Sequence, residues 1–363
     1  MSARDGFMPD FAATGRIPAA GAHGGDAEIV AAALGIDPAS LLDLSASMNP
    51  AAPDPLPVVM PHLRAGLDRY PNPGRATAAL AEAMGVDPER LLLTNGGAEA
   101  ISLVAAEIGG RVIEPSFALH PRGGEPLWQA DPGSPSGLLA AQDEIADVRD
   151  EAFYQLATGR WTRGDAGTVV VGSLTKLLAA PGLRTGYVLA DPGLVAACRA
   201  RQPGWSVNGL VCAALPDLLT SVDLAGSARM IAELRSDLAS VLARHGLSAR
   251  RSDANWVLVQ APGLREALAP HGVLVRDCAS FGMPGIMRIA VPTADGLARL
   301  DAALDAALDA ALDIAPGNSR QGKDRNPRPP TPWDTPASDA TPGQAEQSDC
   351  IPQQPIATRR GEP

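Results

Sequence analysis

The sequence predicts an α/β fold with a mixed, mostly parallel sheet, and three observations support this. Helical patterns alternate with short apolar runs throughout residues 27–315. This alternation is typical of chains in which strands and helices pack in layers. The chain has 363 residues, which is enough for one large domain and a smaller one. Hydrophobic residues make up 45% of it and charged residues 20%, as in an ordinary globular protein.

The expected elements follow one another along the chain. Apolar runs that look like buried strands lie at 91–93, 111–114, 168–172, 186–190, 255–259 and 287–291. Helical patterns accompany them at 76–84, 98–107, 191–202 and 227–245. A last helix is expected at residues 300–312, where a leucine recurs every four residues and forms one stripe. We expect this stripe to pack on the body of the protein, because a four-residue repeat drifts off the seam of a coiled coil.

Charge and cysteine content exclude several classes of protein. The net charge is −11 and the body of the chain has no cluster of Lys and Arg, so no nucleic acid is expected as a partner. The four cysteines show no CxxC spacing, which indicates reduced thiols and neither a disulfide framework nor a metal site. The first ten residues lack an apolar core, and no apolar run approaches the ~18 residues of a membrane span. We therefore expect a cytoplasmic protein with no membrane partner.

The strongest local signal is the segment Ser173-Leu-Thr-Lys176, which directly follows a predicted strand. Only two of the 30 basic residues are lysines, and the other, Lys323, lies in a tail dense in Pro, Gly and Ser. A lysine in a partly buried site has a lowered pKa and can form a Schiff base. Ser173, Thr175 and Arg184 stand close to it in sequence and can hold a phosphate beside it. The alternative is a lysine on a surface loop, but motif, context and the scarcity of lysine favour the cofactor role.

A second segment, residues 94–99, has the sequence Thr-Asn-Gly-Gly-Ala-Glu between a predicted strand and a predicted helix. Free backbone N–H groups at such a helix start attract an anion. Gly-rich turns of this kind are common, so the segment is a weak signal when taken alone. Beside Lys176 it predicts the main phosphate-binding site, at Gly97 and Ala98.

Nine segments of the chain, taken together, match the motifs of one known family. They are His23-Gly-Gly25, Leu42-Asp-Leu-Ser-Ala-Ser-Met-Asn-Pro50, Tyr70-Pro-Asn-Pro73, Thr94-Asn-Gly-Gly-Ala-Glu99, Asp150-Glu-Ala-Phe153, Ser173-Leu-Thr-Lys176, Trp205-Ser-Val-Asn208, Arg276-Asp-Cys278 and Arg288-Ile-Ala290. Through them, residues 22–311 resemble the fold-type I enzymes that use pyridoxal 5′-phosphate (PLP) and are close to histidinol-phosphate aminotransferase. Within that group the chain looks most like the L-threonine-O-3-phosphate decarboxylases of cobalamin biosynthesis. The first, seventh and eighth segments are the ones that point to the decarboxylases.

The resemblance implies the fold of the fold-type I PLP-dependent transferases, with PLP as the cofactor. In this fold a three-layer large domain with a mixed, mostly parallel sheet carries a small α/β C-terminal domain, and two chains form a homodimer. The expected parts are an N-terminal arm at 1–45, the large PLP-binding domain at 46–212, the small domain at 213–315 and a disordered, Pro-rich tail at 316–363. The tail cannot bury enough apolar area to offset its chain entropy.

The resemblance also implies roles for residues around the cofactor. Lys176 would form the Schiff base, and Asp150 would pair with the pyridine nitrogen and keep the ring protonated as an electron sink. From the residues alone, the alternative is that Asp150 only caps the segment that follows it. The cofactor phosphate would be held by Gly97, Ala98, Ser173, Thr175 and Arg184. The ring of His120 would stack on the cofactor, and Tyr70 would reach the phosphate of the neighbouring subunit.

Four further residues would bind the substrate, a small phosphorylated amino acid. By position, Arg276 and Arg288 would bind its anionic groups, with His23 and Asn49 nearby. A substrate with two anionic groups needs two such cations, because guanidinium groups bind carboxylate and phosphate through paired hydrogen bonds. Without the resemblance, the alternative for the two arginines is that they are ordinary salt-bridge partners. For His23 it is a solvated residue near the N-terminus, which is nearly as well supported.

Two positions depart from the family pattern. Ser134, in the segment 131–137, stands where the family has an asparagine that donates to the phenolic oxygen of the cofactor. A serine hydroxyl is shorter, so this hydrogen bond is expected to be lost or to run through a water. Phe153 offers no hydroxyl where aminotransferases often have tyrosine. With these donors missing, we expect the pKa of the Schiff base to rise and the chemistry to slow.

The residues alone leave the reaction open. A decarboxylase holds the substrate carboxylate out of the cofactor plane, whereas an aminotransferase removes the Cα proton with the lysine. The resemblance favours decarboxylation of L-threonine O-3-phosphate to (R)-1-aminopropan-2-ol O-phosphate and CO₂, for the aminopropanol linker of cobalamin. The first alternative is an aminotransferase for histidinol phosphate or a similar phosphorylated amino acid. The second is a degenerate protein that binds PLP or a partner without turnover, and Ser134 favours that possibility.

Overall fold

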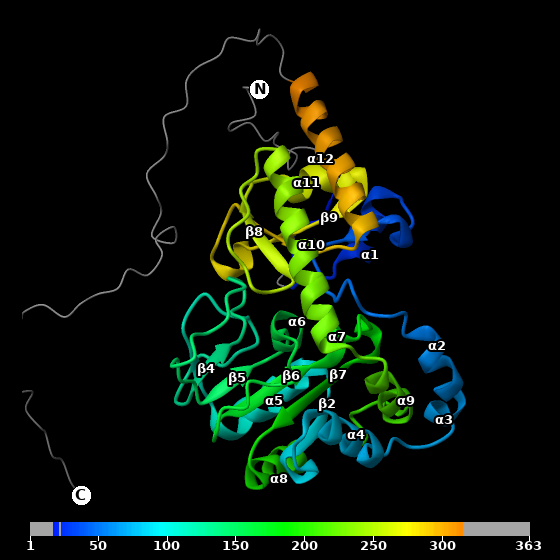
Figure 1. Cartoon of the computed structure of the whole chain (residues 1–363), viewed down its shortest axis with the longest axis vertical. Coiled ribbons are helices and arrows are strands. Elements are labelled where there is room, and N and C mark those ends of the chain that lie inside the picture. Colours follow the sequence, from blue (N-terminus) through cyan, green and yellow to red (C-terminus); the bar gives the residue numbers. More distant parts are fainter. Residues whose placement is uncertain (1–16, 22, 315–363) are drawn as a thin grey trace, which may run out of the picture. The chain divides into compact units, whose positions relative to one another are not determined.

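The computed structural model describes residues 17–21 and 23–314. All of them belong to one compact unit, Ala3–Ser319. The predicted tail at 316–363 and the first part of the predicted arm lie outside the described residues. The described strands form a six-stranded sheet, a three-stranded sheet and a two-stranded pair (Figure 1).

The six-stranded sheet has the order β2-β7-β6-β5-β4-β3. Its strands are β2 (Leu91–Asn95), β3 (Arg111–Val112), β4 (Leu127–Ala130), β5 (Val148–Asp150), β6 (Val169–Ser173) and β7 (Thr185–Leu189). β3, β4, β5 and β6 run parallel, whereas β7 runs antiparallel to its neighbours β6 and β2. This arrangement confirms the predicted mixed, mostly parallel sheet.

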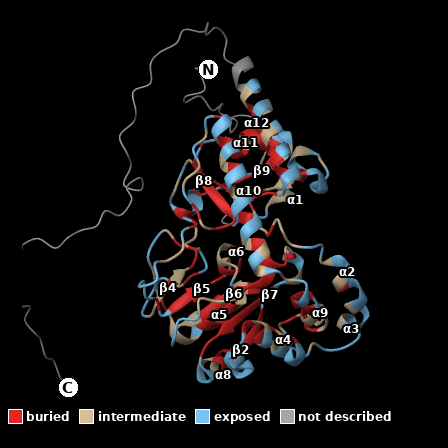
Figure 2. Cartoon of the chain, in the orientation of Figure 1, coloured by how far each residue is buried: buried red, intermediate tan, exposed pale blue. Residues whose placement is uncertain are grey.

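Helices cover both faces of this sheet, because its strands carry apolar side chains on both sides. On one face, Leu93 and Val170 belong to a core that includes α4 and α9. On the other face, Leu92 and Val171 belong to a core that includes α5 and α8. The four helices are α4 (Gly74–Met84), α5 (Gly96–Ile108), α8 (Pro192–Arg201) and α9 (Gly209–Thr220). Between these two helical layers the central strands are buried, as Figure 2 shows.

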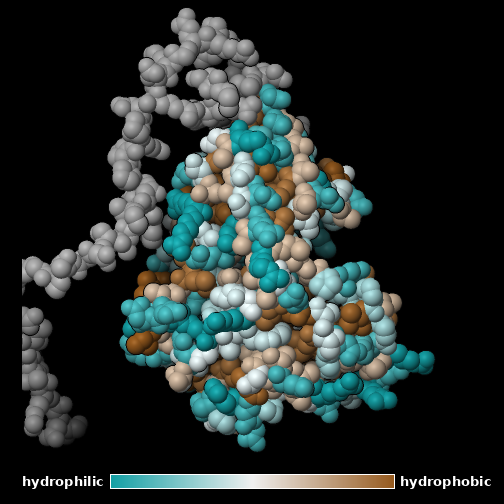
Figure 3. Space-filling view, in the orientation of Figure 1, coloured by the Kyte–Doolittle hydropathy of each residue, from teal (hydrophilic) through white to brown (hydrophobic). Residues whose placement is uncertain are grey.

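The smaller sheet is antiparallel and has the order β10-β11-β8. Its strands are β8 (Trp256–Gln260), β10 (Arg276–Asp277) and β11 (Ile286–Ala290). One face packs against α10 (Leu224–Arg244), α11 (Leu264–Leu268) and α12 (Ala294–Ile314). α10 also contacts α6 (Tyr154–Thr158) beside the larger sheet, and its outward face is hydrophilic (Figure 3). β1 (Leu42–Asp43) pairs with β9 (Val273–Leu274), which joins the N-terminal segment to this part of the chain.

The predicted elements are all present, with ends shifted by a few residues. In α12, Leu300 and Leu304 are buried, so the leucine stripe packs on the body of the protein as expected. The sequence analysis missed β4 and β5, because neither contains an apolar run: Gln129 interrupts β4, and Arg149 and Asp150 occupy most of β5.

Among the described residues, no single helix is long and apolar enough to cross a membrane. Only α9 and α10 taken together reach that length and composition, and they meet at a bend of 79°. The apolar side chains of α9 are buried in the core on one face of the larger sheet.

Candidate active site

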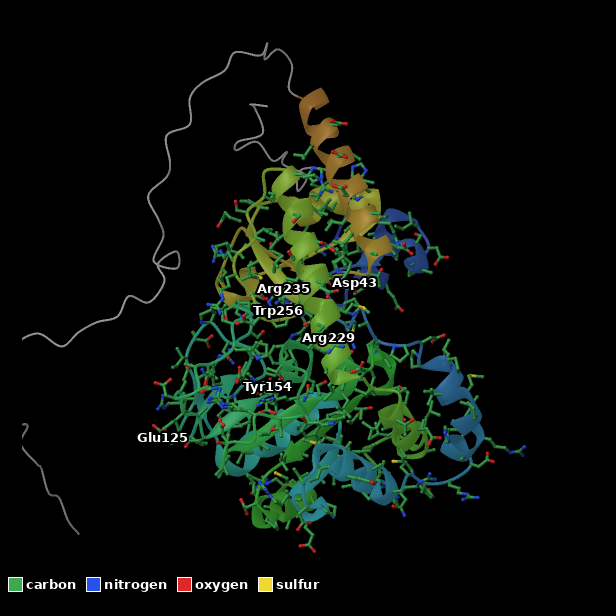
Figure 4. All side chains as sticks on the ribbon, viewed as in Figure 1. Asp43, Glu125, Tyr154, Arg229, Arg235 and Trp256 are labelled. Carbon is green, nitrogen blue, oxygen red and sulfur yellow. The ribbon has the colours of Figure 1, made fainter. Side chains whose placement is uncertain are left out.

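A cavity of about 190 Å³ is lined by the larger sheet, the smaller sheet and the N-terminal segment. Strands β4, β5 and β6 contribute Ala130, Asp150 and Ser173 from their carboxyl ends, where open α/β sheets commonly bind ligands. Figure 4 shows Trp256 and Asp43 near the junction of the two sheets, on the side of the smaller one. Most of the residues predicted to form the site line this one cavity.

Lys176 follows β6 in the short helix α7 (Leu174–Leu177) and lines the cavity. The side chain is half-buried. The pKa of Lys176 is lowered to about 8, first by burial and then by the positive charges of Arg288, Arg184 and Arg276. A large fraction of this amine is therefore neutral and nucleophilic near pH 8.

At the predicted phosphate site, a helix start, a strand end and an arginine lie close together. α5 begins at Gly96, the side chain of Asn95 makes no capping hydrogen bond to it, and Gly97 and Ala98 of this helix start line the cavity. A Cβ on Gly96 would lie 2.3 Å from Nη2 of Arg184, and a Cβ on Gly97 would lie 3.2 Å from the Cβ of Ser173. The five residues predicted to hold the cofactor phosphate all line the cavity: Gly97, Ala98, Ser173, Thr175 and Arg184.

Asp150 lines the cavity at the end of β5, and hydrogen-bond partners hold its carboxylate in place. Oδ2 lies 2.8 Å from Nε2 of His120, whose Nδ1 lies 2.9 Å from Oγ of Ser116. Oδ1 accepts a hydrogen bond from the backbone N–H of Ala152 at 3.0 Å. Asp150 therefore both faces the cavity and caps the segment after it, so the two interpretations of this residue are compatible.

His120 itself does not face the cavity, and this placement corrects the predicted stacking on the cofactor. Its side chain is completely buried, because Asp150 holds Nε2 and Trp128 packs near the ring, with centroids 5.8 Å apart. Phe117, three residues earlier, lines the cavity instead. The sequence shows that this segment carries rings, but only the partners of His120 decide which ring turns inward.

Asn49 is buried and does not line the cavity, contrary to the position expected for a substrate-binding residue. Its Nδ2 donates to the carbonyl oxygen of Leu177 at 3.0 Å, and its backbone N–H donates to that of Lys176 at 3.0 Å. Asn49 thus fixes the helix that carries the lysine. Ser45 and Ser47, from the same motif, line the cavity and were not identified by the sequence analysis.

Tyr70 lies on the surface and does not line the cavity of its own chain. Its ring packs against that of Trp205, with centroids 4.8 Å apart. The role expected for Tyr70 involves a neighbouring subunit, and it stays a prediction.

Arg276 and Arg288 face each other as register partners on β10 and β11. Both line the cavity and both are buried. Arg288 lies over the ring of Trp256, 5.0 Å from its centroid, and donates to the carbonyl oxygen of Ser45 at 3.4 Å. In the described part of the chain, its Nε has no hydrogen-bond partner. Burial, and then the charge of Arg276, lower the pKa of Arg288 to about 9, so an anion bound here would relieve an unfavourable pair of buried cations.

His23 and Gly24 line the cavity from the N-terminal segment. The ring of His23 lies 5.4 Å from that of Phe117, between centroids. Burial and the charge of Arg276 lower the pKa of His23, which favours the neutral ring, and a neutral imidazole can both donate and accept a hydrogen bond. His23 is also exposed, so this placement fits both a role at the site and the alternative of a solvated residue near the N-terminus.

The two residues that depart from the family pattern, Ser134 and Phe153, also line the cavity. Phe153 packs edge-to-face on Trp256, with centroids 4.7 Å apart. The expected effect of the missing donors on the chemistry stays a prediction.

The residues of the cavity fit PLP. A lysine with a lowered pKa, a carboxylate fixed at a strand end and an uncapped helix start beside an arginine all line one space. These groups suit three parts of the cofactor: the lysine suits its aldehyde, the carboxylate its ring nitrogen, and the helix start with the arginine its phosphate. Gly96 at the helix start leaves room for the guanidinium of Arg184, which a Cβ there would meet at 2.3 Å.

Comparison with known proteins agrees with this fit. Residues 126–305 match the protein family described as aminotransferase class I and II. The threonine-phosphate decarboxylase of Salmonella typhimurium is 30% identical over 353 residues, which cover 78% of this chain and 95% of that protein. A histidinol-phosphate aminotransferase of Symbiobacterium thermophilum is 28% identical over 314 residues, which cover 70% of this chain and 87% of that protein.

The fold is shared with solved structures of this group. The histidinol-phosphate aminotransferase of Sinorhizobium meliloti, solved in complex with PLP, superposes with a TM-score of 0.68 at 17% identity. The superposition covers 78% of this chain and 94% of that one. It confirms the predicted fold of the fold-type I PLP-dependent transferases. The chain belongs to the class I and II aminotransferase family, close to the histidinol-phosphate aminotransferases, and its cofactor is PLP.

Proposed function

We propose that the protein decarboxylates L-threonine O-3-phosphate to (R)-1-aminopropan-2-ol O-phosphate and CO₂, the aminopropanol unit of the cobalamin linker. The observation that carries this proposal is the pair of buried guanidinium groups, Arg276 and Arg288, in the cavity of Lys176. A substrate with one phosphate and one carboxylate brings two anions to these two cations. The identity to the decarboxylase of Salmonella typhimurium, along almost its full length, supports the choice of reaction.

Four residues of the cavity have definite tasks in the proposed reaction. PLP, when bound, supplies an electron sink for the electron pair of the bond broken at Cα. Arg276 and Arg288 would bind the anionic groups of the substrate and so fix its orientation in the cavity. The amine of Lys176, with a pKa near 8, holds or releases a proton beside the substrate. Asp150, fixed by His120, keeps a negative charge at the ring nitrogen.

A second candidate is an aminotransferase for histidinol phosphate or a similar phosphorylated amino acid. The relative from Symbiobacterium thermophilum carries that name, and the same two arginines suit a phosphate. In this reaction Lys176 removes the Cα proton, and no CO₂ leaves. A protein without turnover has only Ser134 in its favour, whereas the lysine, the carboxylate and the arginine that PLP needs all line the cavity.

The test is the release of CO₂ from L-threonine O-3-phosphate by the PLP-loaded protein. We expect release by the natural chain, none by Lys176→Ala, and a fall in kcat/KM of about 30-fold or more in Arg288→Met, because a buried ionic contact to the substrate is lost. The matched control is Arg235→Met, which removes a guanidinium that bonds two carbonyl oxygens outside the cavity.

Two other outcomes would contradict the proposal. Amino transfer from histidinol phosphate to 2-oxoglutarate, without CO₂ from the threonine phosphate, would establish the aminotransferase. Bound PLP with neither reaction would establish a protein without turnover.

A further inference from the structure

One buried arginine fastens the N-terminal segment to the part of the chain that carries the smaller sheet. Arg265, on α11, has 1% of its side chain exposed. Its Nη2 donates to Oδ2 of Asp26 at 2.8 Å, and its Nη1 donates to the carbonyl oxygen of Pro18 at 2.9 Å. A single guanidinium therefore holds two points of the chain, one on each side of His23 in the sequence.

The segment held in this way forms a wall of the active-site cavity. His23 and Gly24 line the cavity, and the backbone N–H of Gly25 donates to Oγ of Ser45 at 2.9 Å. A Cβ on Gly24 would lie 2.3 Å from the carbonyl oxygen of Ser45. Because Gly24 packs directly against this carbonyl group, the segment cannot move closer to Ser45. The position of the segment therefore determines where His23 lies in the cavity.

Asp26 also acts on the anion-binding pair. Burial lowers the pKa of Arg276, whereas the negative charge of Asp26 raises it, so the two groups lie within electrostatic range. In the structure, the ion pair with Arg265 balances the charge of Asp26. Only 18% of the Asp26 side chain is exposed, so water compensates its charge poorly. Without Arg265, the carboxylate would be drawn toward the positive charge of Arg276.

We propose that Arg265 is a positioning residue for recognition of the anionic substrate. By holding Asp26 and Pro18, it keeps the Asp26 carboxylate from competing with the substrate for Arg276, and it sets His23 against the cavity. Arg265 acts through these neighbours and does not line the cavity itself. The proposal rests on the proposed function only in requiring that the substrate carries an anion.

The experiment is a double-mutant cycle with Arg265→Met, Asp26→Asn and the double variant. Dissociation constants of L-threonine O-3-phosphate and of inorganic phosphate are measured on the PLP-loaded protein by titration calorimetry. We expect Arg265→Met to raise both constants about tenfold, because an uncompensated carboxylate then lies within electrostatic range of Arg276. Asp26→Asn in the same chain should restore most of the affinity, since the competing charge is gone. Arg265→Lys should also retain most of it, because an ammonium still balances Asp26.

The rescue separates this role from a structural one. A purely structural Arg265 would leave the double variant at least as weak as Arg265→Met, and that result would overturn the proposal. The matched control is again Arg235→Met, which removes a guanidinium on α10 that donates to the carbonyl oxygens of Asp253 and Ala254, so phosphate affinity should not change.

Folding and function are kept apart by two further readings. Thermal unfolding identifies a variant that fails to fold. If Arg265→Met does not fold, the effect of the charge balance on anion binding is measured with Arg265→Lys and Asp26→Asn. A natural chain that binds inorganic phosphate but not L-threonine O-3-phosphate would contradict the proposed function, while the cycle measured with phosphate would still decide the role of Arg265.

Discussion

The reactivity of Lys176 is set by its surroundings. Covalent uptake of PLP requires the neutral amine, so the rate of uptake by the cofactor-free protein should rise with pH and reach its midpoint near the pKa of about 8. Arg288→Met should move this midpoint to higher pH, because it removes a positive charge that favours the neutral form. The measurement is the change in cofactor absorbance after rapid mixing, across a pH series. A midpoint that stays in place in Arg288→Met would show that the charge of Arg288 does not contribute to the lowered pKa.

How much of the site can be predicted from the sequence differs from residue to residue. Ser173, Thr175 and Lys176 belong to one short motif after a strand, so their neighbours in sequence are also their neighbours in space. Asn49 lies in a matching motif as well, and His120 is assigned by its position in the resemblance, yet their side chains turn away from the cavity. Their partners stand 30 and 128 residues away along the chain. A motif fixes the path of the backbone, whereas distant partners fix the direction of the side chain.

At the scale of elements, β7 and the start of α5 meet through glycine. A Cβ on Gly186 would lie 2.3 Å from the carbonyl carbon of Gly96, a backbone atom that cannot turn aside. We expect Gly186→Ala to lower the free energy of unfolding by roughly 1–3 kcal/mol and to weaken PLP binding, because the phosphate site must shift. The control is Gly182→Ala in the adjacent turn η5 (Pro181–Leu183), where a Cβ would meet nothing within 4 Å. Thermal unfolding and equilibrium dialysis measure the two effects, and an unchanged PLP affinity in Gly186→Ala would contradict the prediction.

Short polar strands are the elements that sequence patterns do not reveal. The guanidinium of Arg149, in β5, is completely buried, yet it donates to Oε1 of Gln129 at 2.7 Å and to Oδ2 of Asp165 at 3.1 Å. These partners come from two other segments, so the burial of Arg149 is favourable only in the finished fold. The next residue is Asp150, which explains why the strand most important for the site has the weakest pattern.

At the scale of the whole molecule, we propose a homodimer in which Tyr70 of each chain reaches the cofactor phosphate of its partner. Tyr70 is 79% exposed, Trp205 is 65% exposed and Leu67 is 72% exposed, so this surface offers apolar area for a second chain. Mixing inactive Lys176→Ala chains with Tyr70→Ala chains should restore activity, because each hybrid dimer contains one intact site. Light scattering after gel filtration gives the mass, and a monomer that retains full activity would contradict the proposal.

The pairing of β1 with β9 places a condition on how the protein is made. It joins Leu42 to Val273 and Asp43 to Leu274, residues that leave the ribosome far apart in time. Contacts of such long sequence separation form late, because the entropy of closing the loop must be overcome first. The wall that carries His23 is therefore completed after the larger sheet, once Val273 and Leu274 have been synthesised. A nascent chain can assemble its phosphate site well before it can recognise a substrate.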